Sequence, residues 1–278
     1  MGRRDARPVV GVAPQWRPYA SAAVVAIVAT GIVVCAPFCA PYGPNVPNYG
    51  ARLQPPSATH VFGTDELGRD IFSRALYGTR LSLSAALEVE AAVVPVGVFT
   101  GLIAGYLGGW TDEAIMRITD VFLAFPSLLL AIAIVAALGP GLGNAVFAVS
   151  LTWWPVYARL TRGQVLAIKE LDYVQAARAA GASEWRTMFV HVLRNGLSPI
   201  IVQFTIAIGQ ALVVIAGLSF LGFGARPPQA ELGALVFAGF QYVLVAPWYS
   251  TFPGLAIVAV VLLFGGIGDR LQERLTRG

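Results

Sequence analysis

The chain has 278 residues, of which 56% are hydrophobic and only 12% are charged, and its mean hydropathy is +0.69. Soluble domains carry about 25% charged residues, so this composition excludes an ordinary soluble protein and favours one that has the lipid bilayer as its solvent. The net charge of +4 comes from 18 Arg and the single Lys169, set against 15 acidic residues. The basic residues are scattered between apolar blocks, so they indicate membrane topology rather than binding to nucleic acid.

The apolar gaps between charged residues predict the first two membrane-spanning helices. A span needs about 20 apolar residues, because each adds about 1.5 Å across a hydrocarbon core of about 30 Å. Residues 19–40 satisfy this length; a cleaved signal peptide is the alternative, although its apolar region would be shorter. Residues 91–111 form the second span, and a start as early as Leu81 places Glu88 and Glu90 near one membrane face.

Four further spans follow along the chain. Residues 121–158 are too long for one crossing and contain a glycine- and proline-rich turn at residues 139–144, which predicts a hairpin of two helices. Residues 195–225 and 250–268 provide the fifth and sixth spans, whereas residues 232–245 are too short to cross and are expected to lie at the surface or partly inserted. The predicted fold class is therefore an all-α polytopic membrane protein with six transmembrane helices.

The distribution of basic residues predicts that both termini are cytoplasmic. With the N-terminus inside, 14 basic residues lie on the cytoplasmic side and five lie outside, as the positive-inside rule requires. The chain then divides into a cytoplasmic N-terminal segment (1–18), a first helix (19–40), an extracytoplasmic segment (41–80), a five-helix core (81–268) and a cytoplasmic tail (269–278).

A glycine repeat in the second span predicts close helix packing. The repeat places a glycine at every fourth position, so that one face of the helix is nearly smooth and a neighbouring helix can approach closely. Its members are Gly97, Gly101, Gly105 and Gly109. The role assigned to them is structural.

Few residues are candidates for catalysis, metal binding or ion coupling. Cys35 and Cys39 lie in an apolar segment without C-x-x-C spacing, and His60 and His191 are far apart in sequence, so neither a metal site nor a membrane-embedded enzyme is predicted. Carboxylates inside the spans are sparse, which argues against a proton-coupled secondary transporter. The chain has no Gly-Lys pair and therefore no phosphate-binding loop of its own.

The loop between the fourth and fifth spans, residues 162–198, has the strongest local pattern. Asp172 is suited to cap a helix and Gln175 follows it by three residues, as in a capping box. Gly181 is suited to stop that helix, so a short helix over about residues 173–180 is predicted, and Ser183 can cap a second helix.

The small side chains of this short helix leave its function open when only local chemistry is considered. Ala176, Ala177 and Ala180 give it one side that fits closely into a groove of another protein. An ordinary surface helix is the alternative, and it would more often carry Glu and Lys at its exposed positions.

This loop resembles the EAA motif of the permeases of binding-protein-dependent ABC importers. In that motif two alanines are followed by a glycine four residues after the second, and then by an apolar segment ending near Leu-Pro. Two positions depart from it: Gln175 replaces the usual Glu and so lacks its charge, and Arg194 stands where Pro is common. The matching residues are Gln175, Ala176, Ala177, Gly181 and Leu193.

Other segments resemble the C-type permeases of dipeptide, oligopeptide and nickel importers. These segments are residues 62–74, 105–110, 117–126 and 218–224, and the resemblance extends over nearly the whole chain from about Tyr19. One departure lies in residues 227–233, where Leu232 replaces the usual Trp.

The resemblance implies the transmembrane domain of a type I ABC importer. In such importers a second homologous permease of the B type completes the pore, two cytoplasmic ATPase subunits bind ATP and Mg²⁺, and an extracytoplasmic protein delivers the solute. This chain is then a non-catalytic transport subunit without a cofactor, a metal or a nucleic-acid partner. The residues expected to form the ATPase-coupling helix, from local chemistry and the resemblance together, are Asp172, Gln175, Ala176, Ala177, Gly181, Ser183 and Glu184.

The solute is less well determined than the transport class. Peptides are favoured, with nickel or another small solute as the alternative. A stand-alone secondary transporter is less favoured still, because it would show inverted repeats and functional charges within the membrane. The sequence identifies no substrate-binding residues.

Overall fold

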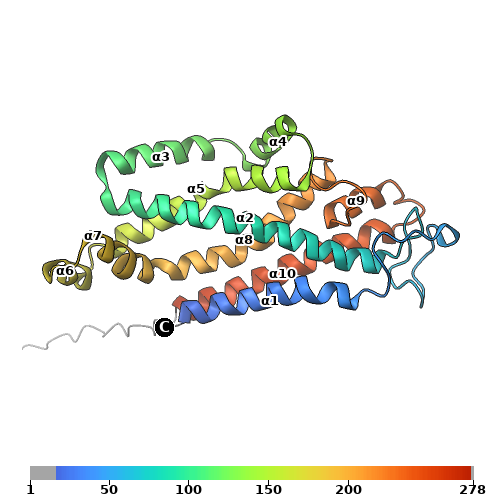
Figure 1. Ribbon diagram of the computed structural model, residues 1–278, viewed down its shortest axis with the longest axis horizontal. Coiled ribbons are helices and arrows are strands. Elements are labelled where there is room, and N and C mark those ends of the chain that lie inside the picture. Colours follow the sequence, from blue (N-terminus) through green and yellow to red (C-terminus); the bar gives the residue numbers. More distant parts are fainter. Residues whose placement is uncertain (1–16, 277–278) are drawn as a thin grey trace, which may run out of the picture.

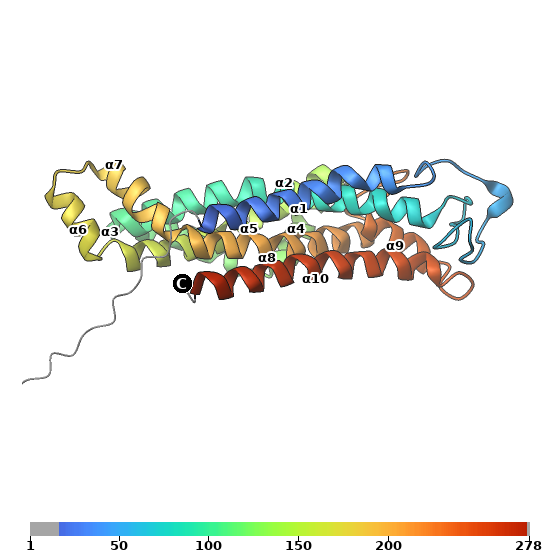
Figure 2. The ribbon, with the colours of Figure 1, turned by 90° about the horizontal axis from the view of Figure 1, so that it is seen from below.

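The computed structural model describes residues 17–276, and within this range the fold is helical, with no strand. Long helices run side by side along the longest axis, as Figures 1 and 2 both show. The principal helices are α1 (Arg17–Cys39), α2 (Ile71–Leu107), α3 (Gly109–Leu123), α4 (Ser127–Leu138), α5 (Leu142–Ile168), α6 (Asp172–Ala179), α7 (Glu184–Arg186), α8 (Arg194–Phe220), α9 (Leu232–Phe240) and α10 (Trp248–Thr276). A π-helical stretch, Thr187–Leu193, joins α7 to α8 without a break.

Three helices of the described chain are long and apolar enough to cross a membrane. They are α2, the continuous helix Glu184–Phe220, and α10. Helices α3 and α4 supply a further crossing if they count as one span, although they are bent by 82° relative to each other. The bend follows the sequence, because Pro126 cannot continue the preceding helix.

The two ends of the bundle differ. Helices α6 and α7 project at one end, and the segment of residues 40–70 lies at the opposite end with α9 (Figures 1 and 2). The start of α1 and the end of α10 both point toward the end that carries α6 and α7 (Figure 1). The two ends of the described chain therefore lie on the same side of the bundle.

The second helix begins earlier than the sequence predicts. It starts at Ile71, where the Asp70 carboxylate accepts a 2.7 Å bond from the Ser73 amide, rather than near Leu81. Glu90 is consequently the twentieth of 37 residues in α2 and fully buried, so its predicted position near a helix end is wrong. The charged residues in the first turns of α2 therefore lie inside the helix, which begins well before the apolar segment.

Other boundaries also shift. The helix predicted to start near residue 121 is two helices, and the first of them already begins at Gly109. The short segment predicted over 232–245 is helical only over Leu232–Phe240, where it packs against α8 and α10. The last helix extends past both predicted ends. These differences arise because helix ends depend on caps and tertiary contacts, which hydropathy does not report.

The core is centred on α2. This helix packs along α5, α8 and α1, and the buried apolar side chains of these helices and α10 form one continuous cluster. Leu83, Ile208, Leu212 and Phe264 are among its fully buried members.

Candidate functional site

The short helix of the α5–α8 loop forms close to where the sequence predicts it, but its N-terminal capping differs. The cap position is Leu171 with no side-chain bond, and Asp172 is the first helical residue, where its carboxylate still complements the helix dipole. The Gln175 amide donates instead to the Lys169 carbonyl at 3.2 Å. The predicted capping box is therefore wrong: a carbonyl at the end of α5 lacks an intrahelical donor and takes the glutamine amide.

The C-terminal end of α6 matches the prediction. Gly181 has φ +86°, a left-handed conformation that favours glycine. Its amide donates to the Arg178 carbonyl at 2.9 Å and the Ala182 amide donates to the Ala177 carbonyl at 3.0 Å, the two bonds of a Schellman ending. Ser183 then caps α7 by accepting from the Arg186 amide at 3.4 Å, as predicted.

One face of α6 is anchored to the bundle and the other is open. Val174 is fully buried and joins an apolar cluster with Leu102, Val165 and Val192. The Tyr173 hydroxyl donates to the His191 carbonyl at 3.2 Å, and burial raises the pKa of this phenol. The exposed positions of α6 are Asp172, Tyr173, Gln175, Ala176 and Ala179, followed by Ala180 and Gly181.

Tyr106, near the end of α2, joins the loop to the bundle. It is only 8% exposed, and its hydroxyl donates a hydrogen bond to the Glu184 carboxylate at the start of α7. The guanidinium carbon of Arg178 lies 5.2 Å from the Tyr106 ring centroid, and hydrogen bonding to this tyrosine raises the pKa of Arg178. The Lys169 ammonium donates to the Gly105 carbonyl at 2.9 Å. The segments on both sides of α6 are therefore tied to one end of α2.

Tyr106 and Lys169 belong to this site although the sequence did not predict them. Tyr106 and its partner Glu184 are 78 positions apart, so no local pattern relates them. The only available signal was the resemblance of residues 105–110 to related permeases, and it carried no role for the tyrosine.

The glycine face of α2 lies against α5. A Cβ at Gly97 would lie 2.4 Å from the Tyr157 Cβ, one at Gly101 would lie 2.3 Å from the Ala158 oxygen, and one at Gly105 would lie 2.9 Å from the Val165 Cβ. These separations are shorter than real Cβ contacts, so the two helices touch through backbone at these positions.

Gly109 does not belong to this face. Helix α2 ends at Leu107, and Gly109 has φ +55° with no atom within 4 Å of an added Cβ. The packing prediction is wrong at this position because the chain reverses at Gly108 and Gly109 to begin α3. The fourth glycine of the repeat is therefore the first residue of α3.

Ion pairs hold α3 against α5 near the same end of the bundle. The Arg162 guanidinium donates to both oxygens of Asp112, at 2.5 and 2.6 Å, in the two-pronged geometry that arginine favours. Arg159 of α5 also forms an ion pair with Asp120 of α3.

At the opposite end, residues 40–70 are fixed by a buried network of charges. Asp65 is fully buried; it accepts from the Arg69 side chain at 2.6 Å and lies 3.4 Å from the Arg74 side chain. Arg74 also donates to the Pro44 carbonyl at 2.7 Å, and His60 contacts Asp70 at 3.0 Å. Charged residues of the segment 62–74 thus hold this end of the molecule in one shape.

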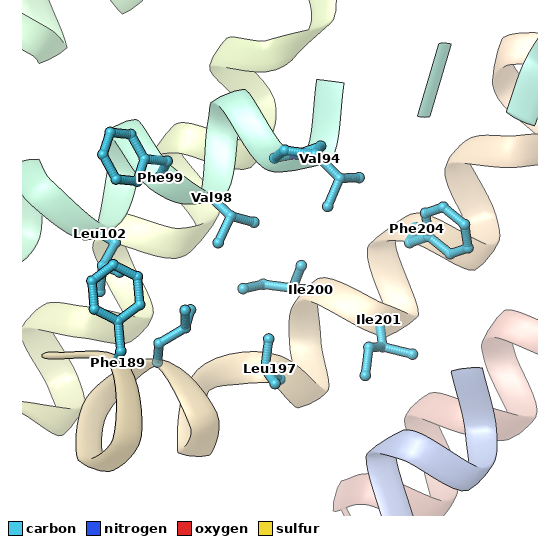
Figure 3. Close-up of a pocket in the computed structure, with 11 residues that line it drawn as sticks. Val94, Val98, Phe99, Leu102, Phe189, Leu197, Ile200, Ile201 and Phe204 are labelled. Carbon is cyan, nitrogen blue, oxygen red and sulfur yellow. The ribbon is translucent and has the colours of Figure 1, made fainter. Parts of the chain in front are cut away.

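Cavities lie between the helices of the described residues, and two of them border α8 or the π-helical stretch before it. The larger, about 370 Å³, separates α2 from the helix Glu184–Phe220, and Figure 3 shows Val98, Phe99 and Leu102 on one side facing Phe189 and Ile200 on the other. Its lining has no polar side chain: Val94, Pro95, Val98, Phe99, Leu102, Phe189, Leu193, Leu197, Ile200, Ile201 and Phe204. The smaller, about 280 Å³, lies at the α3–α4 break and includes Gln203 and Gln210 of α8.

Comparison with known proteins shows the family of the chain. Residues 97–278 match the family described as binding-protein-dependent transport system inner membrane component. The chain is 45% identical over 255 residues to the probable D,D-dipeptide transport system permease protein DdpC of Escherichia coli K12, covering 92% of this chain and 86% of that one. It is 48% identical over 228 residues to the dipeptide permease DppC of Alkalihalophilus pseudofirmus, covering 82% and 75% of the two chains.

Two further similarities concern glutathione and methionine transport systems. The glutathione permease GsiD of Pectobacterium atrosepticum is 43% identical over 256 residues, 92% of this chain and 85% of that one. Among solved structures, the inward-facing MetNI methionine ABC transporter aligns with a TM-score of 0.57 at 20% identity, covering 70% of this chain and 92% of that chain. The second of these similarities concerns the fold alone.

Proposed function

Because the chain belongs to the family of inner membrane components of binding-protein-dependent transport systems, we propose that it forms half of the translocation pore of an ATP-driven importer of short peptides. Its role is transport, as a permease of the inner membrane. The relatives bear names that refer to dipeptides, D,D-dipeptides and glutathione, which are all short peptides or peptide-like molecules. Their shared chemistry supports peptides over nickel as the solute.

The proposal extends to the topology of the chain. Six crossings are formed by α1, α2, the bent pair α3–α4, α5, α8 and α10, whereas α9 does not cross. The end of the bundle with α6 and α7 is cytoplasmic, because basic residues gather there and on the terminal segments. Residues 40–70 and α9 then face the extracytoplasmic side.

The proposal also names the partners. A second, homologous B-type permease completes the pore, an extracytoplasmic solute-binding protein delivers the peptide, and two ATPase subunits bind ATP and Mg²⁺ in the cytoplasm. This chain supplies no nucleotide site of its own, since it has no phosphate-binding loop.

The single observation that carries the coupling role is the geometry of α6. Val174 pins the helix to the bundle, while the small side chains of Ala176 and Ala179 leave its outer face open to a partner. Trp185, 65% exposed and stacked 5.7 Å from Phe189, lies beside it and adds apolar area of the kind found at protein interfaces.

The proposed mechanism is mechanical. ATP binding closes the ATPase dimer, and α6 moves with the subunit on which it is seated. Tyr106 passes the movement to α2 through its bond to Glu184 and its contact with Arg178. Rigid-body movement of packed helices then opens the pore to one side of the membrane at a time.

A charge on α6 tests this role. The variant Ala177→Glu places a carboxylate at a half-buried position next to the exposed face of α6, and the variant Gly181→Trp forces a bulky residue into a left-handed conformation. We expect both to enter the membrane normally, to lose the ATPases on gentle purification and to lose peptide uptake. The matched control is Ala58→Glu, an exposed alanine at the opposite end of the molecule. Normal uptake by Ala177→Glu would contradict the coupling role.

A further inference from the structure

The smaller cavity differs from the larger one in having polar side chains at the depth of the apolar helices. It lies where the α3–α4 break meets α5 and α8, and its volume is about 280 Å³. Its polar groups come from Ser127, Thr152, Tyr157, Gln203 and Gln210. No side chain in its lining carries a charge at neutral pH.

The two glutamines have no protein partner in the part of the chain that the structure describes. Gln203 is half-buried and Gln210 is exposed, and neither makes a hydrogen bond with a described residue. They are the tenth and the seventeenth of 27 residues in α8, so both lie in the middle of an apolar helix. An amide at this depth without a partner is costly in lipid, so these side chains face water or a solute.

Their spacing gives the glutamines a common direction. Seven residues of α-helix turn through almost two full turns and rise about 10 Å, so both amides lie on one face of α8. An extended peptide advances about 3.3–3.6 Å per residue, so about three residues of peptide span the distance between the two amides. Each glutamine offers both a donor and an acceptor, which matches the alternating N–H and C=O groups of a peptide backbone.

One buried carboxylate is bonded to a residue of the cavity lining. Glu90 is fully buried on α2 and accepts a 2.6 Å bond from the hydroxyl of Tyr157, which lines the cavity, whereas Glu90 itself is not part of the lining. The cavity therefore presents hydrogen-bonding groups without a fixed charge, and peptides with acidic, neutral or basic side chains meet the same lining.

We propose that Gln203 and Gln210 of α8 form a hydrogen-bonding track for the backbone of an extended peptide of two or three residues as it passes through the pore. The inference rests on the proposed function and deepens it by naming the residues that contact the solute. The partner permease supplies the other wall, and the α3–α4 break lies beside the track, so movement at the break changes its width.

Cysteine accessibility tests whether the track is a water-filled path, whatever the solute. Cys35 and Cys39 are first replaced by alanine, because both are exposed. In the assembled complex we expect Gln203→Cys and Gln210→Cys to react with a small water-soluble maleimide. The control Leu262→Cys, on α10 and 69% exposed but apolar in its surroundings, is expected to stay unreacted. Protection of both glutamine positions in the presence and absence of ATP would overturn the proposal.

Peptide uptake tests the contacts themselves. In proteoliposomes with the complete complex and its binding protein, Gln203→Leu with Gln210→Leu is expected to lower the uptake of a radiolabelled dipeptide about tenfold, since each lost hydrogen bond contributes a few-fold. Gln164→Leu, a half-buried amide on α5 outside the cavity, is expected to leave uptake unchanged. Co-purification of the partners shows that the variants assemble.

A charge introduced on the track gives a result that a structural role cannot produce. We expect Gln203→Glu to favour a Lys-containing dipeptide over an Asp-containing one by about fivefold relative to the wild type, because the introduced carboxylate attracts a basic side chain and repels an acidic one. The binding protein is the same in both measurements, so it does not cause the difference. The track is overturned if Gln203→Glu has the same selectivity as the wild type, or if the double leucine variant takes up peptide normally. As long as the wild type takes up peptide, the proposed function stands in either case. If the wild type imports no peptide, both the proposed function and the peptide track are overturned. The reactivity of the two introduced cysteines then shows separately whether the cavity is part of a water-filled path.

Discussion

Replacing Gly101 by alanine should separate α2 from α5. The added Cβ would lie 2.3 Å from the Ala158 oxygen and 2.9 Å from the Thr161 Cβ, whereas ordinary contacts begin near 3.4 Å. The helices must therefore move apart by about 1 Å at this point. Overpacking costs about 1–3 kcal/mol, and a clash with a backbone oxygen lies in the upper part of this range, at about 2–3 kcal/mol. The better helix propensity of alanine returns about 1 kcal/mol, so a net loss of about 1–2 kcal/mol is expected.

The assay is thermal unfolding of the purified chain in mild detergent, with Gly163→Ala as the matched control. Gly163 lies inside α5 with nothing within 4 Å of an added Cβ, so only the propensity gain applies there. We expect the midpoint to fall by about 2–6 °C for Gly101→Ala and to stay the same or rise slightly for Gly163→Ala. Equal shifts of the same sign in both variants would refute the close packing of α2 on α5.

Three further outcomes follow from individual contacts. Tyr106→Phe removes the hydrogen bond to Glu184 but keeps the ring, so peptide uptake per ATP hydrolysed should fall about fivefold. Glu184→Ala should have the same effect, and the double variant should lower uptake no further than either single variant. Ser82→Ala removes a 2.7 Å bond to the buried Glu231 carboxylate, so the free energy of unfolding should fall by about 1–3 kcal/mol, and unchanged hydrogen exchange in α9 would contradict this. Asp65→Asn removes the buried charge that faces two arginines, so limited proteolysis should cut residues 40–70 faster than in the wild type; equal rates would show that the charge network does not fix this segment.

Local chemistry allowed the sequence to predict the ends of short elements better than those of long ones. The stop at Gly181 and the cap at Ser183 depend on residues within five positions, so both could be predicted. The Asp172 cap was displaced by one residue because the Gln175 amide serves the end of α5 instead of the start of α6. The end of α5 and the start of α6 thus compete for the same amide, and the capping-box rule considers only one helix.

The start of α2 was misplaced for a related reason. Charges were taken to delimit the helix, yet Arg74 lies within its first turns and is buried against Asp65 and the Pro44 carbonyl. The groups that pair with Arg74 come from the segment before the helix, and only the folded structure brings them close to it. The pairing of Tyr106 with Glu184 was equally beyond reach, since it depends on how α2 and α7 approach each other.

Helix α2 unites the features described above. Its N-terminal end is tied to residues 40–70 through Asp70, its middle contacts α5 through Glu90, and its other end bonds to the loop of α6 and α7 through Tyr106. With 37 residues it is about 55 Å long, so a displacement at one end reaches the other as long as the helix stays rigid.

Rigidity along α2 is weakest at Pro95. Proline lacks the N–H that would bond to the carbonyl one turn earlier, so the ladder is interrupted there. Pro95 also lines the apolar cavity of about 370 Å³, which provides room beside the interruption. Beyond this point the glycine contacts hold α2 closely against α5, so we expect the part from Gly97 to Tyr106 to move together with α5. If the movement proposed above enters at Tyr106, α5 would share it, and α5 also lines the polar cavity.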